Sequence, residues 1–331
     1  MSSIPVRRIR RATTDDLARI HQVAVAAWTP IYERFRHDVG DEMFNDVWAG
    51  WEANWFKLSP EQWHGRGIVT EVNGQVVGFA TWWIINDKGA EVGGNAVDPA
   101  WQGHGIGTQQ VRAVLDIFRD ERHRAARVHT GRDPAHGPAR RQYQSAGFDL
   151  PVLNSIYASR LTDVAQIPPP QRLTVRDPEA LSADALAHLV RVIWEPSFAA
   201  VRLAIGHGLF GIFFSDALEK KRAAIAKVLA ESPNLVRVAY EAGRPVGLCV
   251  LEEDLKKRLG VIAHLGVVPW HRNQGAATAL CMDAFQRFRA AGLRHVHLKA
   301  AVGEDNDSTH SLCWKLGLDR EIPSVDYFMR L

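Results

Sequence analysis

The feature that most constrains the fold of this chain is an internal duplication. The segment "GFDLPVLNSIYASRL" at 147–161 returns as "GLDREIPSVDYFMRL" at 317–331, with a Gly, a Tyr, an Arg and the final Leu conserved at a spacing of 170 residues. Earlier in each copy, "NGQVVGFA" at 73–80 matches "AGRPVGLC" at 242–249 at a spacing of 169 residues. A repeat of this length indicates one folding unit present twice, with small differences in loop length between the copies.

The segment between the two copies predicts a linker. It reads "VAQIPPPQRL" at 164–173, and its three consecutive prolines favour an extended polyproline II backbone over helix or sheet. A chain of 331 residues is long enough for two hydrophobic cores. We therefore predict a first domain at 1–163, a Pro-rich linker at 164–172 and a second domain at 173–331.

Composition and charge exclude several classes of protein. The formal net charge of +3 is too small to indicate a nucleic-acid partner. Cys249, Cys281 and Cys313 are widely spaced without a CxxC or Cys/His pattern, so we expect neither a disulfide framework nor a metal site. The N-terminal "MSSIPVRRIRRA" lacks the apolar core of a secretory signal, and no run approaches ~18 apolar residues. We expect a cytoplasmic protein with no membrane partner.

Hydrophobic periodicity predicts the same order of elements in each copy. In the first copy, β-rich runs flank Asn73-Gly74, a strong hairpin signal, and the strand "GAEVGGNAV" then leads into a glycine-rich loop and a helix. A strand, another helix and a final strand complete each copy, so the predicted fold class is α+β, a sheet with helices on its faces. The apolar residues at i, i+3, i+4 and i+7 of the helix are Val111, Val114, Leu115 and Phe118 in the first copy and Cys281, Ala284, Phe285 and Phe288 in the second.

The glycine-rich loop is typical of a phosphate-binding site. It reads "DPAWQGHGIGT" at 98–108, and "PWHRNQGAAT" at 269–278 takes its place in the second copy. Glycines allow backbone angles and close approaches that other residues do not. A nucleotide-hydrolysing P-loop is excluded because no lysine follows, and a dinucleotide fingerprint is disfavoured because Thr108 stands where the third Gly is needed.

The remaining pattern, Gln102-x-x-Gly105-x-Gly107 with Arg272-x-x-Gly275-x-Ala277 in the second copy, resembles the pyrophosphate loop of the GNAT superfamily of acetyl-CoA-dependent N-acetyltransferases. The resemblance implies two tandem GNAT domains, each a mixed, mostly antiparallel sheet flanked by helices, in a layout similar to that of mycothiol synthase. In such a loop, the unpaired N–H groups of a helix N-terminus bind the pyrophosphate of coenzyme A. The resemblance assigns cofactor binding to Val97, Gln102, Gly103, His104, Gly105, Ile106, Gly107 and Thr108 and to Val267, Arg272, Asn273, Gln274, Gly275, Ala276, Ala277, Thr278 and Asn306.

The same resemblance assigns an acid and a base in the first copy. GNAT enzymes commonly protonate the leaving thiolate with a Tyr four residues before a Gly-Phe pair, and often use a Glu eleven residues before the loop as the base. Tyr143 and Glu91 stand at these places, whereas the second copy has Cys313 and Val261 there. We therefore expect the first copy to be catalytic, although His264 is a further candidate base and the second half is the active one in mycothiol synthase, so the opposite assignment stays open.

Two functional hypotheses follow from the sequence. The first is an enzyme that transfers an acetyl group from acetyl-CoA to a small-molecule amine, with weaker binding or none at the second loop because Ala276-Ala277 crowds the approach. The second is a CoA-binding sensor or interaction protein without turnover. The sequence does not set the oligomeric state.

Four acidic residues could attract a cationic amine or form a solvated helix surface: Asp38, Asp41, Glu42 and Asp46. Three tryptophans at helical spacing predict a core stripe: Trp48, Trp51 and Trp55.

Overall fold

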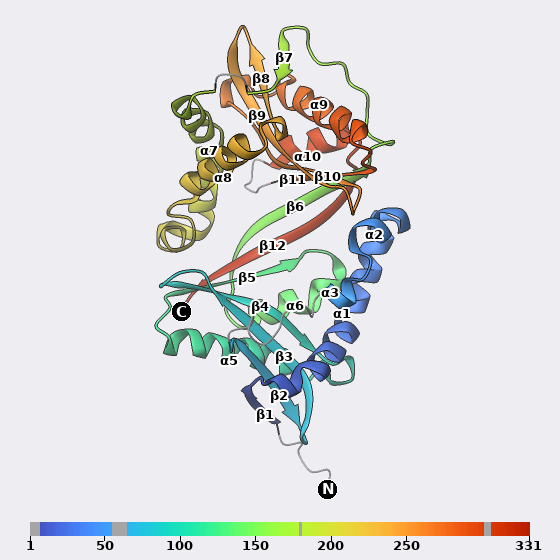
Figure 1. The fold of residues 1–331 in the computed structure, drawn as a ribbon. Helices are drawn as coiled ribbons and strands as arrows, with labels where there is room; N and C mark the ends of the chain where they lie inside the picture. The colour runs from blue at the N-terminus through green and yellow to red at the C-terminus, as the bar shows by residue number, and fades with distance from the viewer. Residues whose placement is uncertain (1–6, 55–64, 179–180, 301–305) are drawn as a thin grey trace.

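The computed structural model describes residues 7–54, 65–178, 181–300 and 306–331 (Figure 1). Trp55 lies outside these residues. The first half contains β1 (Arg7–Arg11), α1 (Leu17–Val39), α2 (Asp41–Trp48), α3 (Trp51–Asn54), β2 (Gly67–Val72), β3 (Gln75–Ile84), β4 (Gly89–Val97), α5 (Ile106–Asp120), β5 (Ala125–Gly131), α6 (Gly137–Ser145) and β6 (Leu150–Arg160). The second contains β7 (Leu173–Arg176), α7 (Ala183–Phe213), α8 (Ala217–Glu231), β8 (Val236–Glu241), β9 (Arg244–Asp254), β10 (Leu259–Val267), α9 (Ala276–Ala290), β11 (His295–Ala300), α10 (Asn306–Lys315) and β12 (Arg320–Arg330).

The strands of the described residues form one continuous sheet through both halves. Its order is β1-β2-β3-β4-β5-β12-β6-β11-β10-β9-β8-β7. The pairs β4–β5 and β10–β11 are parallel, and the other neighbours are antiparallel. The predicted fold class is therefore confirmed, with a mixed, mostly antiparallel sheet in each half and helices on its faces.

The two halves exchange their last strands. β12, at the end of the second half, pairs with β5 of the first half, and β6 of the first half pairs with β11 of the second. Figure 1 shows β6 and β12 side by side where the halves meet. The expectation that each final strand closes its own copy is therefore wrong. The physical reason lies in packing between distant segments: Phe328 of β12 is buried with Ala125 of β5 and with Ile205 and Leu209 of α7. The matching residue of β6, the small Ala158, packs with residues of α1, α2 and α3.

Each half covers both faces of its part of the sheet. In the first half, α1 packs Ile20, Val23 and Ala24 on one face, and the predicted apolar stripe of α5 packs on the other. The predicted stripe of α9 is equally buried in the second half, where Cys281, Ala284, Phe285 and Phe288 are fully inaccessible to solvent. The helical stripes predicted from periodicity are thus confirmed.

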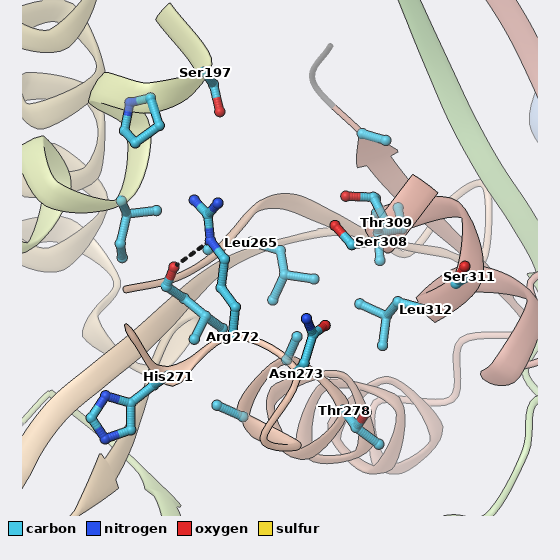
Figure 2. Close-up of a pocket in the computed structure, with 18 of the residues that line it drawn as sticks. Ser197, Leu265, His271, Arg272, Asn273, Thr278, Ser308, Thr309, Ser311 and Leu312 are labelled. Carbon is cyan, nitrogen blue, oxygen red and sulfur yellow. Dashed lines mark hydrogen bonds between the residues drawn. The ribbon is translucent and has the colours of Figure 1, made fainter. Parts of the chain in front are cut away.

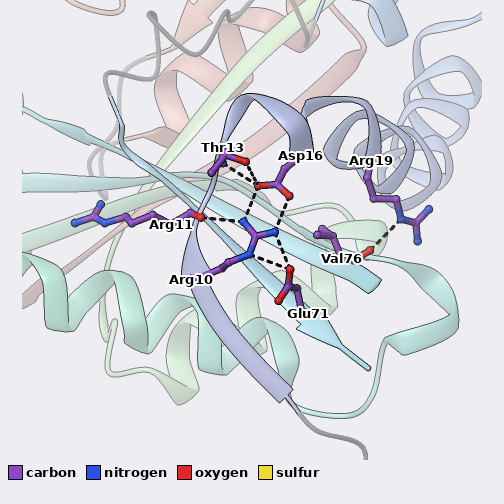
Figure 3. A network of polar contacts seen from close by, with 7 residues as sticks. All are labelled: Arg10, Arg11, Thr13, Asp16, Arg19, Glu71 and Val76. Atoms are coloured by element: carbon purple, nitrogen blue, oxygen red, sulfur yellow. Dashed lines mark hydrogen bonds and ion pairs between the residues drawn. The ribbon is translucent and has the colours of Figure 1, made fainter. Parts of the chain in front are cut away.

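A polar network holds the start of α1 against the first strands of the sheet (Figure 3). The Arg10 guanidinium contacts Asp16 and Glu71, each at 2.7 Å. Asp16 also accepts hydrogen bonds from the backbone N–H and the hydroxyl of Thr13, at 2.8 and 3.0 Å. Arg10 lowers the pKa of the Asp16 carboxyl to about 2, so this carboxylate stays charged at neutral pH. The residues before α1 are therefore fixed by ion pairs rather than by apolar packing alone.

Helices of each half also pack on the other half. Val47 of α2 contacts Leu259 and Val261 of β10, and the C-terminal part of α7 places Ile205 and Leu209 against the first half. Within the described residues, α7 is the one helix long and apolar enough to cross a membrane by length and composition. Part of its apolar surface is buried in this packing, because α7 contributes residues to the cores of both halves, whereas Leu203 remains exposed.

Candidate functional site

Both glycine loops adopt the same backbone conformation at the same place in the sheet. Gly105 and Gly275 are the N-cap residues of α5 and α9, with φ of +74° and +91°. Gly103 and Asn273, two residues earlier, also have positive φ, +79° and +59°. This left-handed geometry exposes successive N–H groups at a helix N-terminus, where an anion is stabilised. Each predicted loop is therefore built as an anion site.

The strands that carry these loops separate from their parallel neighbours just before the loop begins. The ladder between β4 and β5 ends at Val92, and that between β10 and β11 ends at Ile262. The first residue of each motif closes the loop onto the end of its strand. Gln102 Nε2 donates to the Val97 carbonyl at 3.0 Å, and Arg272 Nε donates to the Val267 carbonyl at 3.5 Å (Figure 2). The loops thus stand at the open end of a V between two strands.

In the second half a cavity of about 600 Å³ fills this V. It reaches from Trp194 and Ser197 of α7, past Leu265 of β10, to the loop and α10 (Figure 2). Its charged lining residues are cationic within the described part of the chain: Arg272, Lys299 and Lys315. The predicted cofactor residues that line it are Val267, Arg272, Asn273, Gly275, Ala276, Ala277 and Thr278. Ala276 and Ala277 both line the cavity, with Ala276 almost fully buried, and the expected weakening of cofactor binding by this pair stays a prediction.

Side chains bridge the corresponding V of the first half. Gln142 Nε2 donates to Asn95 Oδ1 at 3.1 Å, and the Tyr143 hydroxyl donates to the same oxygen at 3.3 Å. The Gln142 amide lies so close to Gly107 that a Cβ there would collide with it. At the matching positions, 170 residues later, the second half has the apolar residues Leu265 and Leu312, which line its cavity. A ligand entering the first V must displace the Gln142 side chain.

The predicted acid and base of the first half lie on opposite faces of the sheet. Tyr143 packs in the core beside Val92, and burial raises the pKa of its phenol far above the usual range. Glu91 precedes Val92 on β4 and therefore points to the other face, where it pairs with Arg127 at 2.7 Å. The structure does not bring these two side chains together. Whether they act on one substrate stays a prediction.

The matching residues of the second half lie in apolar surroundings. Val261 contacts α2, as described above, and Cys313 is fully buried, which raises the pKa of its thiol to about 12. The side chain of Asn306 lies outside the described residues. Neither Val261 nor Cys313 lines the cavity.

A lysine that sequence patterns did not indicate contacts His264. Lys221 Nζ of α8 lies 3.2 Å from His264 Nδ1 and 4.9 Å from the ring centre of Trp194. Burial lowers the pKa of Lys221 to about 8, and burial together with the Lys221 charge lowers that of His264 to about 4. His264 is therefore neutral at pH 7 and lies behind the cavity wall formed by Trp194. No local motif marks Lys221, because the contact joins a helix to a strand 43 residues away.

The acidic residues considered for amine binding are engaged in ion pairs. Asp46 accepts from His295 Nε2 at 2.9 Å across the two halves, and Glu42 lies 3.6 Å from Arg294. Asp38 and Asp41 pair with arginines of α1, at 2.8 and 3.1 Å. The ion pairs of Asp46 and Glu42 therefore join α2 to the second half, whereas those of Asp38 and Asp41 are local contacts of α1 and of the start of α2. Among the predicted tryptophans, Trp51 stacks on Tyr32 at 3.9 Å and Trp48 lies against His297, consistent with a core stripe.

Comparisons with known proteins agree with this architecture. The model of the acetyltransferase (GNAT) family matches residues 21–148 and again residues 206–318. The sequence has no significant match among curated proteins.

Solved structures resemble the chain along nearly its whole length. A GCN5-related N-acetyltransferase from Sphaerobacter thermophilus has 17% identity and a TM-score of 0.63, covering 98% of this chain and 95% of that one. A tandem GNAT protein from the clavulanic acid biosynthesis pathway has 13% identity and a TM-score of 0.52, covering 98% of each chain. The glucosamine N-acetyltransferase region of a fungal multi-domain β-N-acetylglucosaminidase has 14% identity and a TM-score of 0.57, covering 99% of this chain and 38% of that one. At these identities the likeness shows the fold alone.

Proposed function

Because the chain belongs to the acetyltransferase (GNAT) family, we propose that it transfers an acetyl group from acetyl-CoA to the primary amine of a small molecule, with both substrates bound at once. The observation that carries this proposal is the cavity of the second half. It connects a helix N-terminal anion site to the opposite face of the sheet through the V between β10 and β11. A donor and an acceptor can therefore meet there from two sides. A cytoplasmic location is part of the same proposal.

The cavity suits the chemistry of coenzyme A. Its volume of about 600 Å³ lies in the range of small-molecule sites, about 300–1,000 Å³. The pyrophosphate would bind the N–H groups of the loop beside Arg272, and Lys315 would add positive charge along α10. The apolar Leu265 and Leu312 would flank the pantetheine arm. These features support cofactor binding at the second loop more than at the first, where Gln142 fills the corresponding space.

In the proposed reaction the neutral amine attacks the thioester carbon, a C–N bond forms, the C–S bond breaks and the thiolate of CoA leaves. The amine nitrogen loses a proton to solvent. A thiol has a pKa of roughly 8.5, so its thiolate leaves near neutral pH without a dedicated acid. This accounts for a second half that has Cys313, buried away from the cavity, where other family members have a Tyr. Glu91 and Tyr143 remain the candidates for chemistry in the first half.

Acetyl-CoA titration with matched loop variants tests the assignment. Ala277→Glu places a carboxylate in the cavity, where it repels the phosphates. Gly105→Glu does the same at the first loop, where a Cβ meets no atom within 4 Å, although the positive φ strains the substitution. Gly275→Glu is a poorer choice, because its Cβ would lie 2.7 Å from Pro170. We expect calorimetry to show binding lost in Ala277→Glu and retained in Gly105→Glu.

The same titration has two other informative outcomes. Unchanged affinity and stoichiometry in Ala277→Glu would contradict the second-half site. Loss of binding in Gly105→Glu alone would return the cofactor to the first half, as the sequence predicted. The alternative function, a CoA-binding sensor or interaction protein, is tested by a separate assay of thiol release. Acetyl-CoA binding without thiol release for any amine would favour it.

A further inference from the structure

We propose that Arg172, the last residue of the predicted linker, is a positioning residue that aims the N–H of Gly275 at the pyrophosphate of the cofactor. The proposal rests on the proposed binding of acetyl-CoA at the second loop. It assigns a binding function to a residue outside the loop motif, in a segment that the sequence predicted to be a spacer.

The guanidinium of Arg172 contacts the outer side of the loop. Its Nη2 donates to the Gln274 carbonyl at 2.8 Å, and its Nε lies 2.7 Å from Glu241 Oε1. The other oxygen of Glu241 contacts His271 Nε2, also at 2.7 Å. Arg172 is thus held by a carboxylate that also holds the start of the loop, which fixes where its second donor points.

The geometry of the peptide bond converts this contact into an orientation of the next N–H. The described residues contain no cis peptide bonds, and in a trans peptide the C=O and N–H groups point in opposite directions. With the Gln274 carbonyl drawn outward to Arg172, the N–H of Gly275 points inward. Gly275 lines the cavity, and within the described residues its N–H has no hydrogen-bond partner. The orphan donor is therefore turned toward the site of the ligand.

The first half contains the same arrangement. Arg7 Nη1 donates to the His104 carbonyl at 2.9 Å, and His104 precedes Gly105 as Gln274 precedes Gly275. Arg7 begins the first strand of its half, and Arg172 immediately precedes the first strand of the other. The surrounding sequences differ, so the common element is an arginine that binds the carbonyl before the N-cap glycine. Its occurrence in both halves indicates a requirement of the loop rather than an incidental surface contact.

The linker itself is packed against the loop. Pro170 lies so close to Gly275 that a Cβ there would be 2.7 Å from its ring, and the Pro170 carbonyl accepts from the N–H of Leu173 at 2.9 Å. Ala165 N–H donates to the Leu316 carbonyl at 2.9 Å earlier in the segment. The linker is therefore anchored along the second half and holds Arg172 in reach of the loop.

The test compares two acetyl donors that differ in the phosphate groups. Acetyl-CoA has the pyrophosphate, whereas S-acetylpantetheine lacks it. With Arg172→Ala we expect the KM for acetyl-CoA to rise about ten- to hundredfold, since a hydrogen bond to a charged group is weakened, while kcat and the KM for S-acetylpantetheine stay unchanged. Arg172→Lys keeps one donor and should restore part of the affinity. Arg176→Ala on β7, whose side chain lies over Tyr240 away from the loop, is the matched control and should leave both KM values unchanged.

Two results would overturn the inference. An unchanged KM for acetyl-CoA in Arg172→Ala would show that the N–H needs no external orientation. An equal rise for both donors would show that the arginine only supports the fold. A wild-type protein that neither binds nor consumes acetyl-CoA would instead remove the proposed function on which the inference rests.

Discussion

The exchange of strands between the halves makes a specific prediction for Phe328. This residue lies on β12, is fully buried, and packs on Ile205 and Leu209 of α7 at the junction of the halves. Its ring centre lies 5.3 Å from that of Phe213. Phe328 belongs to the second half by sequence, yet its strand pairs with β5 of the first. Phe328→Ala should therefore weaken the first half as well as the second.

The expected loss follows from the burial of the side chain. Replacing a fully buried Phe by Ala in a packed core costs about 3–5 kcal/mol of unfolding free energy. A chain of this length has an unfolding entropy of about 0.7 kcal/mol/K, so the midpoint of thermal unfolding should fall by about 4–7 °C. The effect is large because Phe328 is fully buried and the neighbouring rings of Phe213 and Phe214, both at the C-terminal end of α7, can fill the cavity only in part.

Hydrogen exchange read by mass spectrometry locates the effect. We expect Phe328→Ala to increase exchange in β5, residues 125–131, although this strand is about 200 residues away in sequence. Phe288→Ala is the control, because Phe288 is equally buried but lies in the core of the second half. Increased exchange confined to 173–331 in Phe328→Ala would refute the strand exchange.

Three further changes test separate parts of the site and the junction. Tyr143→Phe should change kcat by less than about twofold if transfer takes place in the second half, whereas a fall of about 10²–10⁴ in steady-state rates would place the proton donor in the first. Asp46→Ala leaves the buried His295 without its partner and should lower the unfolding free energy measured in urea by about 1–3 kcal/mol. The control Asp41→Ala, at an exposed ion pair, should cost at most about 0.5 kcal/mol. Equal costs would contradict a stabilising contact between Asp46 and His295 across the two halves. Burial lowers the pKa of Lys221 from 10.5 to about 8, so the unfolded state binds more protons than the folded state between pH 8 and pH 10.5. The stability of the wild type relative to Lys221→Met should therefore rise over this pH range by up to about 3 kcal/mol. A stability difference that does not depend on pH would refute this.

Local patterns predicted the elements and the loops because these depend on residues close in sequence. The hairpin at Asn73-Gly74 joins β2 to β3, and the apolar stripes of α5 and α9 face their cores. The repeat predicted that both halves would share one topology. Gly105 and Gly275 have the positive φ that their place in the motif requires. Apart from the repeat, which is recognised by comparing the two copies, each of these features is specified by residues close together in sequence.

Contacts between distant segments could not be predicted in the same way. Each half ends in a strand at the same place of the repeat, β6 and β12, and the half that each strand joins depends on residues far away in sequence, such as the packing of Phe328 on α7. Asp46 and His295 are 249 residues apart, and a solvated acidic helix has the same composition as one that docks on another domain. Arg172 follows a proline run that indicated a linker, and its contact with Gln274 depends on how the chain returns to the loop.

Whether each glycine loop borders an open cavity could be predicted from the sequence only in part. Alignment of the repeat places Asn95 and Gln142 opposite Leu265 and Leu312, a polar pair against an apolar pair. The sequence contains that difference, but only the structure shows that the polar pair forms hydrogen bonds across the V while the apolar pair lines a cavity.

The release of CoA thiol from acetyl-CoA, followed with a thiol reagent across a panel of small amines, tests the central claim most directly. We predict release that depends on one class of amine, is retained in Gly105→Glu and is abolished in Ala277→Glu. Binding of acetyl-CoA with no amine-dependent release, or release that survives Ala277→Glu unchanged, would contradict acetyl transfer in the cavity of the second half.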